Sequence, residues 1–186
     1  MSTLDPRVET VAGPVRVFIA CSLDGFIAGR DNDLSWLPAP QGGVDYGYHE
    51  LLGQTSAILL GRGTYDVAAG CTDWPYAEMP VFVATRRALE PVAPSVRPIS
   101  GTPAELLSIV REHIEGGIYL DGGNLIRSFL DEGLIDELTV TIVDVILGAG
   151  VPLFAGVTRR HRLKLTSSTE YPNGLVQLRY TPCRSG

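Results

Sequence analysis

The sequence has few residues of the kinds that bind metals. Its three cysteines, Cys21, Cys71 and Cys183, lie far apart and form no Cys-x-x-Cys pair, and only three histidines accompany them. A zinc site needs three or four such ligands at short, regular spacings. We therefore expect no metal centre, and the odd number of scattered cysteines fits a reducing cytoplasm.

Long apolar runs are also missing. No stretch approaches the roughly 18 apolar residues that cross a bilayer. The first fourteen residues are polar and include Asp5 and Glu9, whereas a secretory signal needs a basic start followed by an apolar run. We expect a cytoplasmic protein without membrane contact, in which residues 1–14 form a flexible tail.

Positive charge is in deficit, because 15 Lys and Arg residues face 21 Asp and Glu residues and the net charge is −6. A protein that wraps duplex nucleic acid needs a basic face, so we expect no nucleic-acid partner. Apolar residues make up 45% of the 186 positions and charged residues 19%, which excludes a disordered chain. A chain of this length forms one ordinary domain, here expected over residues 15–186.

Apolar, strand-like runs alternate with helix-like segments after the tail. Continuous apolar runs at residues 57–61, 80–85 and 117–121 are typical of strands that helices cover on both faces of a sheet. The pair Asn173-Gly174 between two late runs predicts an antiparallel hairpin at the end of the domain. We therefore expect a single α/β domain built on one mixed, twisted sheet.

The predicted helices have recognisable starts and ends. Thr102 and Glu105 form a Thr-x-x-Glu capping box at the start of one helix, with Pro103 in its first turn. Helices are predicted over residues 45–54, 64–69, 103–115 and 124–132, and strands over residues 15–21, 57–61, 80–85, 96–99, 117–121, 137–146, 161–170 and 175–181.

Three predicted strand ends carry groups suited to phosphate. In an open α/β sheet, ligands lie at the carboxyl ends of the strands, where helix N-termini also point. The first of these corners holds Gly61, Arg62 and Thr64, which offer a close backbone approach, a cation and a hydroxyl. An ordinary Gly-x-Gly turn with Thr64 as a helix cap explains the same residues equally well.

The second and third corners follow two other buried strands. Thr85, Arg86 and Arg87 could hold the 2′-phosphate that distinguishes NADP from NAD, because Arg pairs bidentately with phosphate. A solvated basic turn is the alternative. At the third corner, free N–H groups at a helix start could meet a pyrophosphate, although a tight connection would look alike. Its residues are Asp121, Gly122, Gly123, Asn124 and Leu125.

The other half of a redox site is expected near the first strand. A glycine-rich loop follows that strand and could close over a nicotinamide ring, with Asp24 and Trp36 on the substrate side. Asp45 begins a predicted helix and could donate a proton if an apolar cleft raised its pKa, or it could simply cap the helix. His49 lies one turn later, and Thr141 on a predicted strand is the potential partner of Asp45.

Four stretches, in this order, resemble the dihydrofolate reductase superfamily and, within it, the reductase domain of the bacterial riboflavin-biosynthesis deaminase–reductase. The interval from Asp45 to Gly61 is 61 − 45 = 16 positions, which also matches dihydrofolate reductases. The stretches are Ser-Leu-Asp-Gly at 22–25, Gly-Arg-Gly-Thr-Tyr at 61–65, Asp-Gly-Gly-Asn at 121–124, and Leu-Ile-Asp-Glu-Leu at 134–138 leading into 145–148.

The resemblance implies an eight-stranded mixed sheet flanked by helices, an NADPH cofactor and a homodimer, with residues 143–154 as a candidate interface. It implies that the first two corners surround the adenosine phosphate and that the third cradles the pyrophosphate. It also implies that Ala20 and Ile27 meet the nicotinamide through backbone groups. Asp45 and Thr141 fall where those enzymes place the acid and its supporting Thr, and His49 replaces their stacking aromatic residue.

We therefore expect an NADPH-dependent reductase that transfers hydride to a small molecule linked to a nitrogen heterocycle. A 5-amino-6-(5-phosphoribosylamino)uracil reductase is the closest expectation, although Phe26 replaces the Lys that such reductases carry. Dihydrofolate reductase activity and a non-catalytic NADP-binding module are the alternatives. A hydrolase using Ser22 or Cys21 is disfavoured, because no Gly-x-Ser-x-Gly elbow is present.

Overall fold

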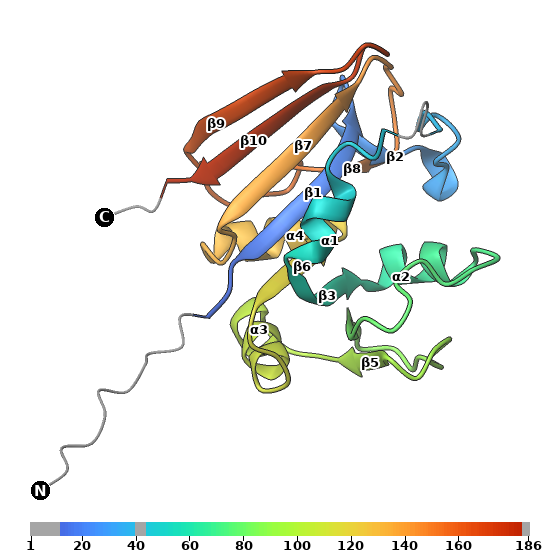
Figure 1. Cartoon of the computed structure of the whole chain (residues 1–186), viewed down its shortest axis with the longest axis vertical. Coiled ribbons are helices and arrows are strands. Elements are labelled where there is room, and N and C mark those ends of the chain that lie inside the picture. Colours follow the sequence, from blue (N-terminus) through green and yellow to red (C-terminus); the bar gives the residue numbers. More distant parts are fainter. Residues whose placement is uncertain (1–11, 40–43, 184–186) are drawn as a thin grey trace, which may run out of the picture.

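Eight strands hydrogen-bond into one sheet at the centre of the molecule (Figure 1). The computed structural model describes residues 12–39 and 44–183. The strand order is β5-β4-β3-β6-β1-β7-β10-β9, so the predicted eight-stranded sheet is confirmed. Its strands are β1 (Val15–Ser22), β3 (Thr55–Gly61), β4 (Val81–Ala84), β5 (Val96–Ile99), β6 (Gly117–Asp121), β7 (Glu137–Val143), β9 (Leu163–Glu170) and β10 (Val176–Pro182).

The sheet is mixed, as expected. Strands β5, β4, β3, β6, β1 and β7 are all parallel, whereas β10 is antiparallel to both β7 and β9. The β9–β10 hairpin turns where Tyr171 N donates to Leu175 O at 2.9 Å and Gly174 N donates to Tyr171 O at 3.0 Å. The predicted C-terminal hairpin is therefore confirmed, with a loop longer than two residues.

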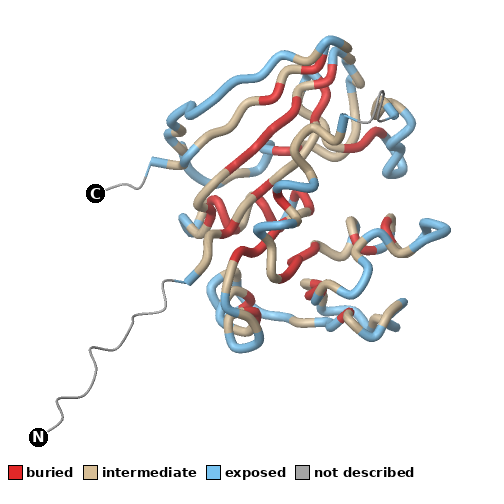
Figure 2. The backbone as a smooth tube through the Cα atoms, viewed as in Figure 1, coloured by how far each residue is buried: buried red, intermediate tan, exposed pale blue. Residues whose placement is uncertain are grey.

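Helices cover both faces of the parallel strands, because alternate strand residues point to opposite faces. On one face, Leu59 of β3 packs in a cluster with α3 and α4, and on the other face Ile58 packs with α1 and α2. Figure 2 shows the buried backbone concentrated in these central strands, whereas β9 is exposed along its length. The helices are α1 (Tyr48–Gly53), α2 (Arg62–Ala69), α3 (Pro103–Arg111) and α4 (Gly123–Asp131).

Three local differences separate the structure from the sequence-based expectation. Helix α1 begins at Tyr48 rather than at Asp45, because Tyr46 (φ 55°) and Gly47 (φ 90°) take left-handed backbone conformations. Strand β7 ends at Val143, where Val145 N turns back to donate to the Val143 carbonyl at 2.8 Å. The glycine-rich loop contains a short strand, β2 (Phe26–Ala28), paired with β8 (Val151–Pro152), and a 3-10 turn, η1 (Arg30–Asn32).

The expected N-terminal tail falls mostly outside the described residues. Of its last residues, Gly13 accepts a hydrogen bond from Arg111 Nη2, and Pro14 O accepts one from Ile118 N at 2.9 Å. These contacts join the chain before β1 to α3 and β6. None of the helices in the described part of the chain is long and apolar enough to cross a membrane.

Candidate functional site

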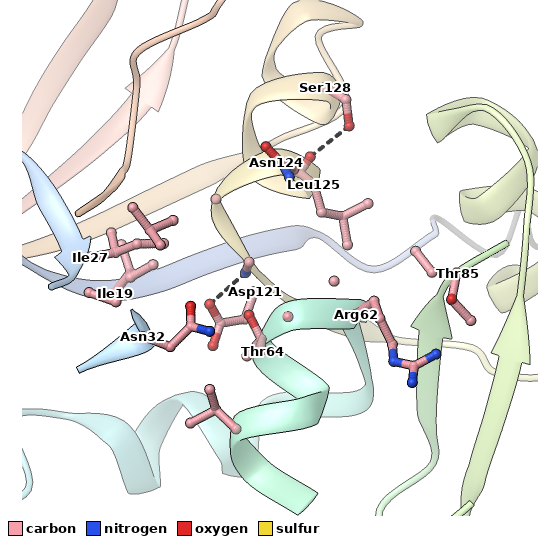
Figure 3. Close-up of a pocket in the computed structure, with 18 of the residues that line it drawn as sticks. Ile19, Ile27, Asn32, Arg62, Thr64, Thr85, Asp121, Asn124, Leu125 and Ser128 are labelled. Carbon is pink, nitrogen blue, oxygen red and sulfur yellow. Dashed lines mark hydrogen bonds between the residues drawn. The ribbon is translucent and has the colours of Figure 1, made fainter. Parts of the chain in front are cut away.

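A cleft of about 970 Å³ opens along the carboxyl edge of the parallel strands. It extends across the ends of β5, β4, β3, β6 and β1, in the spatial order of the sheet. Figure 3 shows Arg62 and Thr85 at one end and Ile19, Ile27 and Asn32 at the other. The cleft is therefore elongated, as a dinucleotide site at such an edge must be.

Every residue that the sequence predicts to bind the cofactor lines this cleft. The structure thus brings the three predicted corners together with the end of β1 and the start of β2. These residues are Ala20, Ile27, Gly61, Arg62, Thr64, Thr85, Arg86, Arg87, Asp121, Gly122, Gly123, Asn124 and Leu125. Their roles in binding a cofactor stay predictions, because they follow from position alone.

The first and third corners touch each other through glycines. Gly122 has a φ of +113°, and a Cβ built on it would lie 3.0 Å from Thr64 Oγ1 and 3.1 Å from Gly61 N. Any side chain at Gly122 would therefore be strained by the backbone conformation and would also crowd the other corner. Glycine at this position lets the starts of α2 and α4 lie next to each other on the cleft.

The starts of α2 and α4 have no side-chain caps. Their N-cap residues are Gly61 and Gly122, and neither can accept a hydrogen bond from the first helical N–H groups through a side chain. Uncapped N–H groups and the positive end of the helix dipole both favour an anion. Two such helix starts beside one cleft fit the two phosphates of a pyrophosphate.

The arginines of the cleft differ in how far they are already paired. Arg62 Nε lies 2.7 Å from Asp66 Oδ1, and its Nη1 donates to Ala88 O at 2.9 Å. Arg87 Nη2 lies 3.7 Å from Asp66 Oδ2. Among the described side chains, no acidic group pairs with Arg86, which is exposed. Arg86 is therefore the guanidinium with most capacity left for a phosphate.

A fourth corner, between β5 and α3, was missed by the sequence reasoning. Ser100, Gly101, Thr102 and Pro103 line the cleft beside the Thr85–Arg87 turn of β4. Thr102 was interpreted only as a helix cap, and that capping box is confirmed: Glu105 N donates to Thr102 Oγ1 at 3.3 Å, and Thr102 N to Glu105 Oε2 at 2.7 Å. Gly101, between the end of β5 and the cap of α3, was the sequence signal that could have indicated this corner.

At the other end, the loop after β2 supplies residues that the sequence reasoning also missed. Asn32 lines the cleft and has a left-handed backbone (φ 60°), which is uncommon outside glycine but tolerated by asparagine. Leu34 and Leu37 line the same end. Strand pairing with β8 holds the Phe26–Ala28 part of the loop, and the part beyond Ala28 has no such pairing. The expected mobile loop is therefore partly anchored.

Asp121 is the only acidic residue among the described residues that line the cleft. Its Oδ2 accepts a hydrogen bond from Tyr119 Oη at 3.1 Å, and its Oδ1 accepts one from Gly122 N at 2.6 Å. Burial raises the pKa of Asp121, and the hydrogen bonds from Tyr119 and Gly122 oppose that rise. A carboxyl group in this setting holds its proton to higher pH than an exposed one.

Asp45 has a different environment from the one predicted. Its Oδ2 accepts a hydrogen bond from His49 N at 2.7 Å and lies 2.5 Å from His49 Nδ1, and its Oδ1 accepts one from Gly47 N at 3.2 Å. These bonds lower the pKa of Asp45 to about 2. The raised pKa that a proton-donating Asp45 would need is absent, and the alternative, in which Asp45 caps the start of the helix, describes its contacts.

The other predicted catalytic and substrate residues also lie off the described lining of the cleft. Thr141 is buried in β7, and its Oγ1 accepts a hydrogen bond from Gln177 Nε2 at 3.1 Å, not one from Asp45. The His49 side chain is 86% exposed. The aromatic ring that packs inward from α1 is Tyr48, 6.0 Å from the ring of Phe18 and 6.2 Å from that of Tyr119.

Asp24 and Trp36 make hydrogen bonds to the backbone of loops in this structure. Asp24 accepts hydrogen bonds from Leu147 N at 3.1 Å and Gly148 N at 2.7 Å, which join the β1–β2 turn to the segment after β7. Trp36 Nε1 donates to Asp33 O at 3.1 Å within its own loop. Neither residue lines the cleft among the described residues, so their substrate contacts stay predictions.

The structure also bears on the hydrolase alternative. Ser22 is fully buried, and its hydroxyl donates to Asp24 Oδ1 at 2.7 Å while accepting from Phe26 N at 2.9 Å. Burial raises the pKa of the Cys21 thiol to about 11, which keeps it protonated and poorly nucleophilic. Neither side chain is placed to attack a substrate.

Comparison with known proteins identifies the family. The chain matches the RibD C-terminal domain over residues 14–177 and therefore belongs to that family, whose members are reductase-like. The uncharacterized protein YwjB of Bacillus subtilis (strain 168) is 31% identical over 166 residues, which cover 88% of this chain and 95% of YwjB. The predicted membership of the dihydrofolate reductase superfamily, closest to the RibD reductase domain, is confirmed.

Solved structures share the same fold. The crystal structure of a "putative riboflavin biosynthesis protein" from Shewanella sp. PV-4 has a TM-score of 0.82 and 34% identity, covering 92% of this chain and 99% of that one. The deaminase/5-amino-6-(5-phosphoribosylamino)uracil reductase of Thermotoga maritima has a TM-score of 0.67 at 21% identity, covering 92% of this chain and 57% of that one. The second likeness concerns the fold alone.

Proposed function

We propose that this protein is an NADPH-dependent reductase whose substrate carries a nitrogen heterocycle, with 5-amino-6-(5-phosphoribosylamino)uracil reductase activity as the leading candidate. The observation that carries the proposal is the elongated cleft across five strand ends, with two uncapped helix starts at its middle. Bound there, the cofactor supplies a hydride. The chain's own residues bind it, orient it and exclude water from its reactive end.

The residues present fit such a cofactor in the order that its chemistry requires. Arg86 and the Thr85 turn would meet the 2′-phosphate, and the starts of α2 and α4 would meet the pyrophosphate. Ala20 and Ile27 would lie against the nicotinamide, as expected from the sequence. The apolar lining from Ile19, Ile27 and Leu34 at that end would exclude water from the ring.

The affinities for NADPH and NADH test whether Arg86 binds the 2′-phosphate. Loss of a charge-assisted hydrogen bond costs about 1.5–3 kcal/mol, so Arg86→Gln should weaken NADPH binding by about ten-fold or more and leave NADH binding almost unchanged. Isothermal titration of both cofactors measures this. The matched control is Arg160→Gln, an exposed arginine in the segment before β9, which should change neither affinity.

Turnover decides among the remaining activities. Loss of nicotinamide absorbance would be followed with 5-amino-6-(5-phosphoribosylamino)uracil and, separately, with dihydrofolate. Turnover of the first supports the leading candidate, whereas turnover of dihydrofolate alone would replace it. NADPH binding with no turnover of either substrate would favour the non-catalytic NADP-binding module, and failure to bind NADPH would remove the proposal altogether.

We also propose that the protein is a homodimer, as the family resemblance implies. We propose a cytoplasmic location as well, which the odd number of scattered cysteines favours. Within residues 143–154, Ile146 is 70% exposed and Phe154 38% exposed. Exposed apolar side chains of this size are the kind that a second copy of the chain would cover.

A further inference from the structure

A carboxyl group lies at the end of the cleft where hydride transfer would take place. Asp121 ends β6, which lies between β3 and β1 in the sheet, and in Figure 3 it lies toward Ile19 and Ile27, away from Thr85. The arginines lie toward the opposite end. Asp121 comes directly before the α4 start assigned to the pyrophosphate, and the Tyr119 hydroxyl lies between it and Phe18 O on β1, next to the nicotinamide end at Ile19 and Ala20.

The groups around Asp121 are aromatic and hydroxylic. The titratable groups that face it are Tyr119 on β6, Tyr48 on α1 and Tyr76 in the loop after α2. Burial raises the pKa of each tyrosine, and the nearby Asp121 charge raises it further. Among the ion pairs of the described residues, none places a lysine, arginine or histidine on Asp121. With no cation paired to the carboxylate, burial is the largest effect on Asp121 and raises its pKa.

Tyr119 holds Asp121 through a shared hydroxyl. Tyr119 is only 5% exposed, and its Oη lies 3.1 Å from Asp121 Oδ2 and 3.1 Å from Phe18 O. The hydroxyl has one proton, so it donates to one of these oxygens at a time. A donor that can turn toward the carboxylate stabilises the charge that appears when Asp121 loses its proton.

We propose that Asp121 is the proton donor to the substrate nitrogen and that Tyr119 is a positioning residue that sets the pH range over which Asp121 can act. This inference rests on the proposed reductase function and deepens it. Asp45, which carries a stable charge and already accepts hydrogen bonds from Gly47 and His49, has no proton to give at neutral pH.

The proposed step balances atoms and electrons. Reduction of a carbon–nitrogen double bond adds a hydride, supplied by the reduced nicotinamide, to carbon. The π electron pair moves to nitrogen, which takes the proton from Asp121 as the carboxyl O–H bond breaks. The resulting carboxylate keeps its hydrogen bonds from Tyr119 Oη and Gly122 N, and solvent returns a proton after product release.

The pH dependence of kcat/KM tests this role. The rate should fall as pH rises through the pKa of the acid. Asp121→Asn should lower kcat by about 100-fold or more and remove this falling limb while NADPH still binds. Tyr119→Phe should move the limb to higher pH, because loss of the donated hydrogen bond raises the pKa of Asp121 further. A merely structural Tyr119 would lower the rate without moving the limb.

Two further variants complete the comparison. Glu112→Gln changes an exposed carboxylate at the C-terminal end of α3, whereas the Thr102 corner lies at the start of that helix, and it should leave rate and pH profile unchanged. Asp45→Asn should leave the falling limb in place. If Asp45→Asn removes the limb and Asp121→Asn keeps it, the proposal is overturned.

A measurement without substrate covers the case in which a variant is simply misfolded or inactive. Carbon-13 NMR of the aspartate carboxyls, with the Asp121 signal assigned by its loss in Asp121→Asn, follows ionisation directly. We expect the midpoint of Asp121 above the ordinary value of about 3.9. A midpoint at or below that value would overturn the inference even if NADPH binds, whereas failure of NADPH binding with a raised midpoint would count against the reductase function instead.

Discussion

At Gly122 the backbone takes a φ of +113° while lying against Gly61 and Thr64. The sequence could suggest that Gly122 belongs to a phosphate-binding turn, because two glycines follow a buried strand. It could not show that this turn presses on another one 61 residues earlier in the chain (122 − 61 = 61). That contact depends on the order β3-β6 in the sheet, which no local pattern contains.

Gly122→Ala should therefore destabilise the protein by about 1–3 kcal/mol and weaken NADPH binding, because the strain and the crowding both fall on the cleft. Urea unfolding and cofactor titration would measure the two effects. Gly53→Ala is the matched control, since Gly53 lies in α1 with nothing within 4 Å of an added Cβ. That control should be neutral or slightly stabilising, by up to about 1 kcal/mol.

Asp45, the catalytic acid predicted from the sequence, shows that spacing along the chain does not determine the pKa of a side chain. Asp45 has the spacing of a catalytic carboxylate, but its pKa depends on which atoms lie around it. Two successive left-handed residues, Tyr46 and Gly47, delay the start of α1 and let its backbone N–H groups close around that carboxylate. Asp121, assigned only to the cofactor, has the buried environment that was expected for Asp45.

At the scale of elements, the four predicted helices and eight predicted strands are all present. Most carry a buried apolar run or a strong start signal, whereas the exposed β9 is indicated by its hairpin turn with β10. The elements that were missed are β2, β8 and η1, of three, two and three residues. Runs this short have no periodicity to detect. Strands β2 and β8 exist because they pair with each other, although they lie more than a hundred positions apart in the chain.

The capping box of α3 gives a prediction for one element. Thr102→Ala removes the hydroxyl that accepts from Glu105 N and should lower the free energy of unfolding by about 1 kcal/mol. Urea denaturation would measure this loss of stability, and the m-value should stay unchanged. Ser108→Ala, at an exposed position in the middle of the same helix, is the control and should stabilise slightly, since alanine has the higher helix propensity.

A second element-scale prediction concerns acid stability. Asp131, the last residue of α4, accepts hydrogen bonds from Thr158 N at 2.9 Å and Thr158 Oγ1 at 2.8 Å and lies 2.7 Å from His161 Nε2. These contacts lower its pKa to about 2. A depressed folded-state pKa stabilises the fold above about pH 4 and loses that effect as pH falls toward 2.

Asp131→Asn should therefore lower the melting temperature at pH 7 and flatten the loss of stability between pH 4 and pH 2. Thermal unfolding of both proteins across this range would measure the difference. An unchanged slope in the variant would mean that the Asp131 contacts with Thr158 and His161 do not persist in solution.

For the whole molecule, the resemblance implies a homodimer, so light scattering should give twice the chain mass of 20.0 kDa. If residues 143–154 form the interface, Ile146→Asp should shift the particle toward the monomer, because a charge would replace an apolar side chain that is 70% exposed in the single chain. Leu165→Asp, at a side chain 50% exposed on β9, is the comparison variant and should leave the particle mass unchanged. Monomeric wild-type protein would contradict the expectation outright.

The strand directions have a practical consequence for handling the protein. β1 starts, and the antiparallel β10 finishes, at the border of the sheet opposite the parallel strand ends that form the cleft. An affinity tag, a fluorescent reporter or a fused enzyme joined ahead of β1 or behind β10 would emerge on that remote border. N-terminal and C-terminal fusions should therefore bind ligand with the same affinity as the unfused protein.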